Sequence, residues 1–323
     1  MTGRRSIESE ILSRYGFQQT SIAIEGLKGR GWKKGAFVIF RLPFTLGRSV
    51  SVVRRFSPQA VIGVGGYSAG PVCLAARLLG ISTAIHEQNS YPGLTNRLLS
   101  RVVNKIFISF PESAKHFPAG KPILTGNPVR EDLLADETAG DKDGDRFTVL
   151  IVGGSQGARA INRTVVTALE VLKEEECEPV VIHQSGVTDH QEVNAAYRDR
   201  GLTGEVMPFI QDMAAAYRRA DLVVSRAGAT TIFELAALGK PSILIPYPYA
   251  ANRHQETNAL ALVQAGGAEM VLEDELSGER LAALLLKYMD DRTALRQMGR
   301  RARTFGQPDA AKRIVDQLET VFN

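Results

Sequence analysis

Three glycine-rich turns carry most of the chemistry that the sequence suggests. They span residues 63–70, 153–157 and 225–231, and each directly follows a short β-branched run. Glycine lets a ligand come close to the backbone, and the free N–H groups at the start of a following helix favour an anion. A single turn of this kind could equally be a tight connection between a strand and a helix. Three of them at corresponding strand ends favour a phosphate-bearing ligand.

The third turn leads into a helical pattern with a carboxylate near its start. The helix is expected to end at Gly239, which places Glu234 about one and a half turns from its beginning. Glu234 could simply stabilise the positive end of the helix dipole. Alternatively, it could accept hydrogen bonds from the two ribose hydroxyls of a nucleotide whose diphosphate lies at the helix N-terminus, a division of labour known from dinucleotide folds. The polar segment 253–258 would face the same crevice.

None of the turns fits a standard nucleotide-binding pattern. In the first turn Ser68 stands where G-x-G-x-x-G requires its third glycine, and G-x-x-x-x-G-K-[ST] does not occur. A dinucleotide-dependent dehydrogenase is therefore disfavoured.

The elements that must position these turns alternate between short β-branched runs and longer helical patterns. Such alternation is typical of a parallel sheet flanked by helices, so the fold class is α/β. Two sets of runs are expected to form two sheets, with ligands at the carboxyl ends of the strands. The expected strands are residues 60–64, 81–86, 105–109 and 122–125 in the first half, and 147–152, 179–184, 205–208, 222–225, 242–246 and 269–272 in the second.

A charged, glycine-containing run at 136–145 separates the two sets and is interpreted as a linker. The predicted domains are therefore residues 1–135 and 146–307, and a closing helix at 308–323 could belong to either. The first half opens on a helical pattern at 7–15 instead of a strand. The usual opening strand–turn–helix unit is therefore expected to be absent.

Size and composition agree with a two-domain globular protein. The chain has 323 residues, of which 44% are hydrophobic and 23% charged. Its apolar runs are shorter than the ~20 residues of a membrane helix, and no signal-peptide pattern opens the chain, so a cytoplasmic location is expected. Cys73 and Cys177 are expected to be reduced thiols without a metal. A net charge of +4 and a pI near 9.1 do not choose between anionic partners.

Five ordered motifs together resemble one family. Besides the second and third turns, they are Gly-Gly-Tyr-Ser-Ala-Gly at 65–70, His-Glu-Gln-Asn at 86–89 and Gly-Asn-Pro-Val-Arg at 126–130. In order and spacing they resemble the MurG family of N-acetylglucosamine transferases, over essentially the whole chain. The resemblance implies a GT-B fold, in which two Rossmann-like doubly wound domains face a cleft. It also implies transfer of GlcNAc from UDP-GlcNAc to undecaprenyl-pyrophosphoryl-MurNAc-pentapeptide (lipid I), giving lipid II with inversion in peptidoglycan synthesis.

The resemblance also implies roles for individual residues. Glu234 would hold the ribose and Ile210 would meet the uracil. The remaining roles fall on the two sides of the reaction: Ala229, Thr230 and Thr231 at the donor diphosphate, Ser155 and Arg130 at the donor phosphates or sugar, Asn89 and Gln255 at the GlcNAc, and Gly65, Gly66, Tyr67 and Ser68 at the acceptor diphosphate. No cofactor and no tightly held metal are implied, and loosely bound Mg²⁺ is left open.

One family feature has no counterpart. The family opens with a strand and a Gly-Gly-Thr-Gly-Gly-His loop, whose histidine is the favoured catalytic or acceptor-positioning residue, and the first residues here resemble the sequence after the second strand. We therefore expect a missing N-terminal unit, through either a misplaced start or a true truncation. Glu87 and Tyr67 are then the candidate catalytic residues on the acceptor side. The alternatives are a truncated, non-catalytic UDP-GlcNAc-binding fragment, or another GT-B enzyme such as a glycolipid synthase or a UDP-GlcNAc 2-epimerase.

A segment at 31–48 mixes basic residues with large apolar ones. It could be a core helix with a solvated basic face. It could also be an interfacial patch that rests on an anionic membrane, with Trp32, Phe37, Phe40 and Phe44 as the inserting side chains. The expected partners are therefore UDP-GlcNAc, lipid I and the inner face of the cell membrane, with no nucleic acid.

Overall fold

The structure, a computed structural model, describes residues 16–20, 32–135, 146–153 and 158–320, without the side chains of 32–42 and of Tyr67. It divides the chain into two compact units, residues 1–125 with 312–323, and residues 126–311. Residues 126–135, which the sequence analysis grouped with the first domain, therefore pack with the second unit. The predicted helix at 7–15 and the linker at 136–145 lie outside the described residues.

The first unit is built on a four-stranded sheet of order β1-β2-β3-β4. All its neighbouring strands are parallel, as the alternating pattern predicted. The strands are β1 (Ala60–Gly63), β2 (Ser82–Glu87), β3 (Lys105–Ile108) and β4 (Pro122–Leu124).

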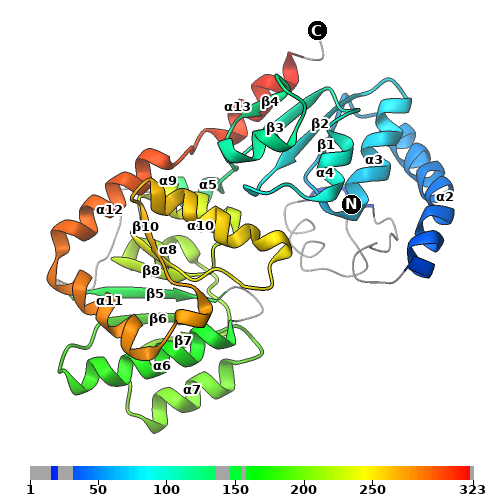
Figure 1. The fold of residues 1–323 in the computed structure, drawn as a ribbon. Coiled ribbons are helices and arrows are strands. Elements are labelled where there is room, and N and C mark those ends of the chain that lie inside the picture. The colour runs from blue at the N-terminus through cyan, green and yellow to red at the C-terminus, as the bar shows by residue number, and fades with distance from the viewer. Residues whose placement is uncertain (1–15, 21–31, 136–145, 154–157, 321–323) are drawn as a thin grey trace. The chain divides into compact units, whose positions relative to one another are not determined.

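Helices pack on this sheet in two apolar clusters (Figure 1). In one, Cys73 lies with Ile85 and Ile106. In the other, Ile314 of the C-terminal helix lies with Ala84 and Phe107. The helices of this unit are α2 (Trp32–Phe56), which packs on α3 (Gly66–Leu78), α4 (Leu94–Leu99), the short 3₁₀ helix η1 (Pro111–His116) and α13 (Ala310–Glu319).

The second unit contains a six-stranded parallel sheet of order β10-β9-β8-β5-β6-β7. The chain order reverses between β5 and β8, and the crevice at the carboxyl ends of strands at such a switch point is the usual ligand site. The six predicted strands are all present as β5 (Thr148–Val152), β6 (Val180–Gln184), β7 (Glu205–Met207), β8 (Leu222–Ser225), β9 (Ser242–Leu244) and β10 (Ala268–Met270).

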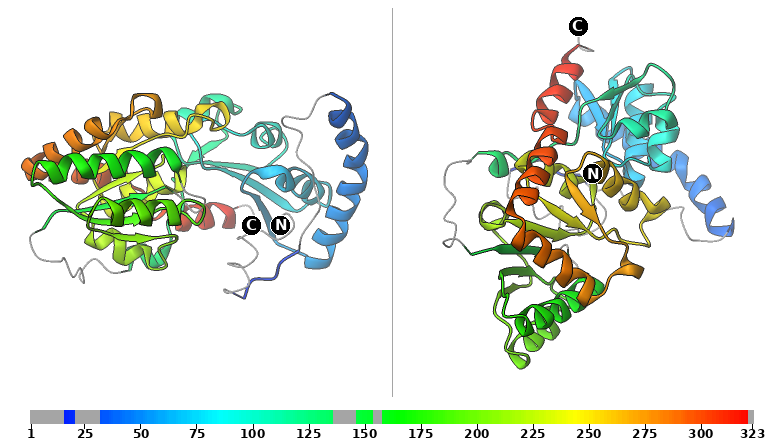
Figure 2. Two further views of the ribbon diagram at one scale, coloured as in Figure 1. Left: turned by 90° about the horizontal axis from the view of Figure 1, so that it is seen from below. Right: turned by 60° about the vertical axis from the view of Figure 1, so that its left-hand side comes forward.

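Helices cover both faces of this sheet (Figures 1 and 2). Val149 and Ile151 of β5 pack into the cluster that contains Ile161 of α6, whereas Leu150 between them is fully buried on the opposite face. The helices are α5 (Glu131–Leu134), α6 (Arg159–Glu174), α7 (His190–Asp199), α8 (Met213–Arg219), α9 (Ala229–Leu238), η2 (Ala251–Arg253), α10 (His254–Gln264), η3 (Glu273–Glu275), α11 (Gly278–Asp290) and α12 (Arg292–Phe305).

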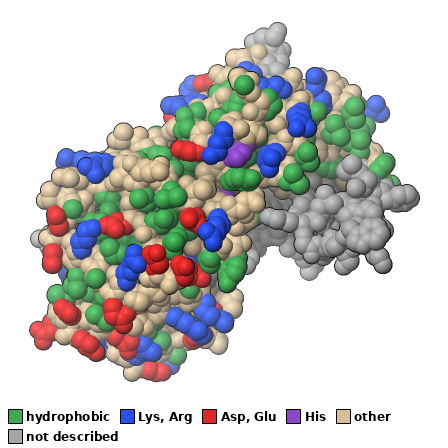
Figure 3. Space-filling model, viewed as in Figure 1, with side chains coloured by type: hydrophobic (Ala, Val, Ile, Leu, Met, Phe, Trp, Pro, Cys, Tyr) green, Lys and Arg blue, Asp and Glu red, His purple; other side chains and the backbone are tan. Residues whose placement is uncertain are grey.

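The described helices include none with the length and hydrophobicity needed to cross a membrane. Acidic and basic side chains are interspersed over the second unit on the face drawn in Figure 3. On this face of the second unit, neither sign of charge forms a large patch of its own (Figure 3).

Candidate functional site

The β8–α9 connection presents backbone groups that could bind an anion. Its cap residue, Gly228, has an extended conformation (φ −64°, ψ 144°), and no side chain caps the helix. The helix then begins with Ala229, Thr230 and Thr231. The first N–H groups of a helix have no acceptor within it and lie at the positive end of its dipole. The three residues predicted to lie along a diphosphate are therefore those that can donate to one.

Glu234 lies on the same helix and has two partners. The hydroxyl of Tyr217 on α8 donates a hydrogen bond to Glu234 Oε2 at 3.1 Å, and Arg130 Nε lies 3.9 Å from Oε1. Burial raises the pKa of Glu234 above its usual value, while the Arg130 charge and the Tyr217 hydrogen bond oppose this shift. A carboxylate accepts up to about four hydrogen bonds, so this one has capacity for two more donors.

Arg130 lies at the start of α5, in the same unit as Glu234. Its side chain is 52% exposed and also lies 3.7 Å from Asp132. Such an exposed ion pair contributes little to stability. Arg130 thus lies near Glu234 of α9, and its side chain remains about half exposed to solvent.

Ile210 follows β7 and is held by a neighbouring strand. Its side chain is buried, and its N–H donates to Gln184 Oε1 at 3.0 Å. Gln184 is the last residue of β6 and is itself buried. The Ile210 N–H is therefore already engaged within the protein, and Gln184 is a residue that sequence reasoning missed.

Gln255 lies in the first turn of α10, where its Oε1 accepts a hydrogen bond from the Tyr247 N–H at 2.9 Å. The loop before it is braced by Arg226, which donates to the carbonyls of Ile245 and Pro246 at 3.2 Å each. The guanidinium also pairs with Glu273 at 2.5 Å and lies 5.3 Å from the centre of the Tyr247 ring. Arg226 therefore ties together the segments that follow β8, β9 and β10.

The strand order arranges these groups in a row at the carboxyl ends of the strands of the second sheet. Ile210 follows β7 at one end, the α9 N-terminus follows β8 near the middle, and Gln255 follows β9 further along. Base, diphosphate and sugar of a nucleotide sugar have the same linear order. Ser155, the remaining donor-side prediction in this unit, lies outside the described residues.

The predicted acceptor-side residues lie in the first unit, around the β1–α3 turn. Gly65 and Gly66 have positive φ angles of 90° and 76°, and Ser68 lies in the first turn of α3. The backbone of Tyr67 lies in the same first turn of α3. This turn has the strand–glycine–helix form that the sequence predicted.

Glu87 ends β2 with its carboxylate fully engaged. Oε1 accepts from the N–H and the side-chain amide of Asn89 at 3.1 and 3.3 Å. Oε2 accepts from the Gly93 N–H at 3.1 Å and from Asn96 Nδ2 at 2.8 Å. Glu87 is only 2% exposed. Its geometry is that of a carboxylate that holds the loop containing Asn89 in place.

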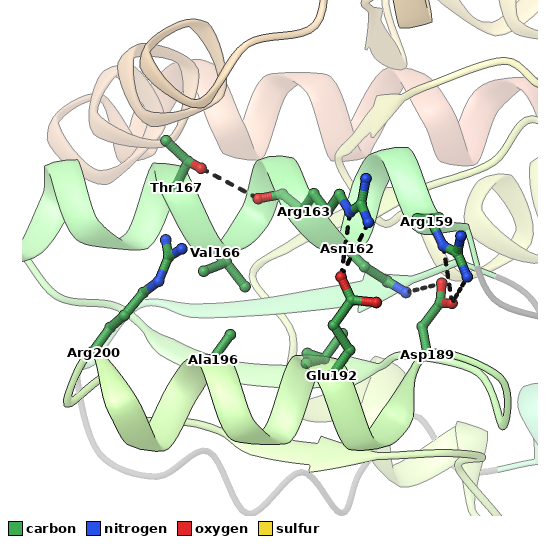
Figure 4. Close-up of a pocket in the computed structure, with 10 residues that line it drawn as sticks. Arg159, Asn162, Arg163, Val166, Thr167, Asp189, Glu192, Ala196 and Arg200 are labelled. Atoms are coloured by element: carbon green, nitrogen blue, oxygen red, sulfur yellow. Dashed lines mark hydrogen bonds and ion pairs between the residues drawn. The ribbon is translucent and has the colours of Figure 1, made fainter.

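A hollow of about 340 Å³ lies between α6 and α7 in the second unit (Figure 4). Two pairs of its charged side chains are bonded to each other, since Arg159 lies 3.3 Å from Asp189 and Arg163 lies 3.2 Å from Glu192. Beneath it, burial lowers the pKa of His183 to about 4, so this histidine is neutral at physiological pH. We interpret the hollow as structural.

Sequence reasoning also missed Tyr217 and Arg226. Tyr217 had no signal, because it comes from a separate helix and meets Glu234 only in the fold. Arg226 stood inside the quoted 225–231 motif, where its charge was the available signal. Among the described residues, no group of three or more His, Cys, Asp or Glu side chains could hold a metal ion.

Comparison with known proteins finds matches for both halves of the chain. The glycosyltransferase family 28 N-terminal domain matches residues 1–108, and the family 28 C-terminal domain matches residues 148–314. The UDP-N-acetylglucosamine–N-acetylmuramyl-(pentapeptide) pyrophosphoryl-undecaprenol N-acetylglucosamine transferase of Syntrophus aciditrophicus is 44% identical over 97% of this chain and 87% of that protein. The enzyme of the same name from Myxococcus xanthus is 44% identical over 97% of this chain and 82% of its own length. The chain belongs to this transferase family.

Solved structures show the same architecture. Acinetobacter baumannii MurG is 33% identical, with a TM-score of 0.78 over 99% of this chain and 89% of that chain. Two parallel-sheet, Rossmann-like units are thus confirmed as a MurG-like GT-B fold. The UDP-GlcNAc 2-epimerase of Neisseria meningitidis, solved with UDP-GlcNAc, has a TM-score of 0.66 over 97% of this chain and 88% of its own, at 16% identity. That likeness concerns the fold alone, so the epimerase alternative gains no support from it.

Proposed function

We propose that this chain transfers GlcNAc from UDP-GlcNAc to lipid I and so forms lipid II, with inversion at the anomeric carbon. The observation that carries this proposal is membership of the transferase family over both halves of the chain. The donor groups of the second unit support it, because they lie in the order of the parts of a nucleotide sugar.

In this proposal the donor lies along the carboxyl edge of the second sheet. Ile210 meets the uracil, and Glu234 accepts hydrogen bonds from the ribose hydroxyls. The N–H groups of residues 229–231 hold the diphosphate together with Arg130, and Ser155 adds a hydroxyl there. Gln255 contacts the GlcNAc through its side-chain amide, joined by Asn89 of the first unit.

The reaction breaks the bond between the anomeric carbon and the UDP oxygen, so negative charge grows on the diphosphate. The helix N–H groups and the Arg130 guanidinium stabilise that charge without needing to reorganise. The attacking acceptor hydroxyl must also lose a proton. Glu87 could take this proton only by giving up amide donors that hold its loop, so it acts here as a positioning residue.

The acceptor diphosphate is proposed to lie along Gly65, Gly66, Tyr67 and Ser68. The polyprenyl chain keeps the enzyme at the inner face of the membrane, where α2 contacts anionic lipid through Trp32, Phe37, Phe40 and Phe44. Of these, Phe44 is 71% exposed, beside the exposed Arg48. Replacing Phe40 and Phe44 with serine should weaken co-sedimentation with anionic vesicles and leave the low affinity for zwitterionic vesicles unchanged. Unaltered binding to anionic vesicles would refute this contact.

The reaction itself is tested by measuring UDP release from UDP-GlcNAc with and without lipid I, alongside calorimetric binding of UDP-GlcNAc. The proposal predicts saturable binding and release that depends on lipid I. Binding without any release would identify a non-catalytic UDP-GlcNAc-binding protein. Conversion of UDP-GlcNAc to its 2-epimer without lipid I and without net UDP release would point to epimerase-type chemistry.

A further inference from the structure

A second hollow, of about 320 Å³, lies beside the donor edge of the second unit. It is formed by the loop after β9, the first turn of α10 and the segment after β10. Its lining residues combine aromatic rings, prolines and acidic side chains: Pro246, Tyr247, Pro248, Tyr249, Arg253, Glu256, Leu272, Glu273 and Asp274. No role in the proposed donor site uses these side chains.

The aromatic wall is unusually open to solvent. Tyr247 is 44% exposed and Tyr249 is 81% exposed, and their rings meet edge to face with centroids 5.6 Å apart. Exposed tyrosines at a rigid, concave surface are typical of binding sites, because they offer a large apolar face and a polar tip at low entropic cost. The wall is therefore suited to a ligand that has both an apolar stem and a polar end.

The charges of the hollow favour a cation. It is lined by three carboxylates and one guanidinium, that of Arg253. Glu256 lies 3.7 Å from Arg253, and Glu273 is paired with Arg226. Asp274 is exposed and has no cationic partner among the described residues. A diphosphate would be repelled here, whereas an ammonium group would find a carboxylate and the face of a tyrosine.

The hollow is held in shape by the donor site itself. Arg226 fixes the Ile245 and Pro246 carbonyls and lies against the Tyr247 ring. The N–H of Tyr247 in turn donates to Gln255. In strand order the hollow lies at β9 and β10, at the opposite end of the sheet from Ile210. It therefore adjoins the sugar end of the proposed donor, where the acceptor must approach.

We propose that this hollow binds an ammonium-bearing side chain in the peptide of the acceptor. The inference rests on the proposed function, and the relatives' name includes a pentapeptide-bearing acceptor. The ammonium group lies against Asp274 and the ring of Tyr249, and the aliphatic stem lies along the prolines and Tyr247. The site selects among acceptors by their peptide, while the donor edge selects the nucleotide sugar.

The test uses two lipid I analogues that differ only in whether one peptide lysine is free or Nε-acetylated. With the unmodified protein, acetylation should raise the KM for the acceptor on the order of fivefold. Asp274→Asn should raise the KM for the free-lysine acceptor by a similar factor and remove the discrimination, and Tyr249→Ala should do the same. The KM for UDP-GlcNAc should stay constant throughout.

Glu275→Gln is the matched control, because Glu275 is exposed, pairs with Arg280 and does not line the hollow. It should keep the full discrimination. Equal KM values for the two acceptors with the unmodified protein would overturn the inference, as would discrimination that survives in both variants. Anisotropy of the two labelled acceptors on the UDP-saturated protein repeats the comparison without turnover. Preferential binding of the free lysine without UDP release would therefore support this site while contradicting the proposed reaction.

Discussion

The two glycine turns, β1–α3 and β8–α9, look alike in the sequence and differ in backbone conformation. Gly65 has φ 90° and ψ −168°, and Gly66 has φ 76°, which are conformations that side chains with a Cβ rarely adopt. Gly228 has φ −64° and ψ 144°, which any residue adopts. The backbone therefore requires glycine in the first turn. In the second, we infer that glycine leaves free space in front of the helix amides.

The two carboxylates near these turns differ in the same way. Glu87 accepts four hydrogen bonds from amides of its own loop. Glu234 accepts one from a tyrosine and faces a guanidinium at 3.9 Å. A carboxylate whose oxygens already accept all the hydrogen bonds they can stabilises the fold. One whose oxygens can accept further hydrogen bonds is able to bind a ligand. The difference separates a carboxylate that holds its own loop from one that can still accept hydrogen bonds from a ligand.

The largest effect is expected from Glu87→Ala. It leaves the buried amide donors of the loop without an acceptor, and the expected loss in the free energy of unfolding is about 3 kcal/mol. Urea denaturation of the full chain, followed by circular dichroism, measures it. Glu112→Ala, at an exposed position of η1 in the same unit, should change the free energy by less than about 0.5 kcal/mol. A stable Glu87→Ala protein with an altered pH–rate profile would instead make Glu87 the base.

Glu234→Gln should weaken ligand binding. The neutral amide keeps an acceptor for Tyr217 and loses the charge, so UDP affinity should fall by about 2 kcal/mol, or roughly thirtyfold. Calorimetric titration with UDP measures this change, and thermal unfolding without ligand should be little altered. Equal UDP affinities of the two proteins would remove Glu234 from the ribose site.

The pH dependence of UDP binding should also report the charge of Glu234. Because the pKa of Glu234 is raised by burial, its carboxylate is protonated at a higher pH than an ordinary glutamate. Lowering the pH through that raised pKa should weaken UDP binding, since the neutral acid is a poorer acceptor, on the order of tenfold. The stability contribution has the opposite sign: it is present below the unfolded pKa and is lost as the pH rises through the folded one. In Glu234→Gln the acid limb of UDP affinity should disappear.

The sequence predicted the strands well because each is a short, buried, β-branched run. Leu222–Ser225 is entirely buried, as strands covered on both faces are, and the glycine after α9 has the left-handed φ of 62° that ends a helix. Such features depend on neighbours in the chain. The motif 126–130 and the helical pattern after the 225–231 turn likewise supplied Arg130 and Glu234, which the fold brings together.

The partners of these residues could not be predicted, because they depend on packing. Tyr217 reaches Glu234 from another helix, and Gln184 reaches Ile210 from another strand. The sequence placed Glu87 at a strand end facing a ligand, and nothing local indicated that four amides would surround it. Spacing along the chain indicates where a carboxylate lies. It does not indicate whether the carboxylate oxygens already accept hydrogen bonds from the protein.

Gly65→Ala should cost about 1 kcal/mol of unfolding free energy, through strain alone. The nearest atom to an added Cβ is Asn96 Nδ2 at 3.9 Å, so no steric clash contributes. Denaturant unfolding measures the loss, and UDP affinity should be unchanged. Gly93→Ala is a suitable control in the same unit, because Gly93 has φ −65° and an added Cβ there meets no atom within 4 Å.

The smallest effect is expected from Gly228→Ala, which separates the effect on ligand affinity from the effect on the free energy of unfolding. An added Cβ would have ordinary contact with Thr231 Oγ1 at 3.7 Å and no backbone strain, so unfolding should change by less than about 0.5 kcal/mol. The methyl group would, however, project at the helix N-terminus, where the diphosphate is proposed to lie, and UDP affinity should fall about threefold, or roughly 0.6 kcal/mol. Calorimetry and denaturation on one preparation separate the two effects. If stability fell and affinity held, the backbone would require glycine at 228 as it does at 65, and the contrast between the two turns would be lost.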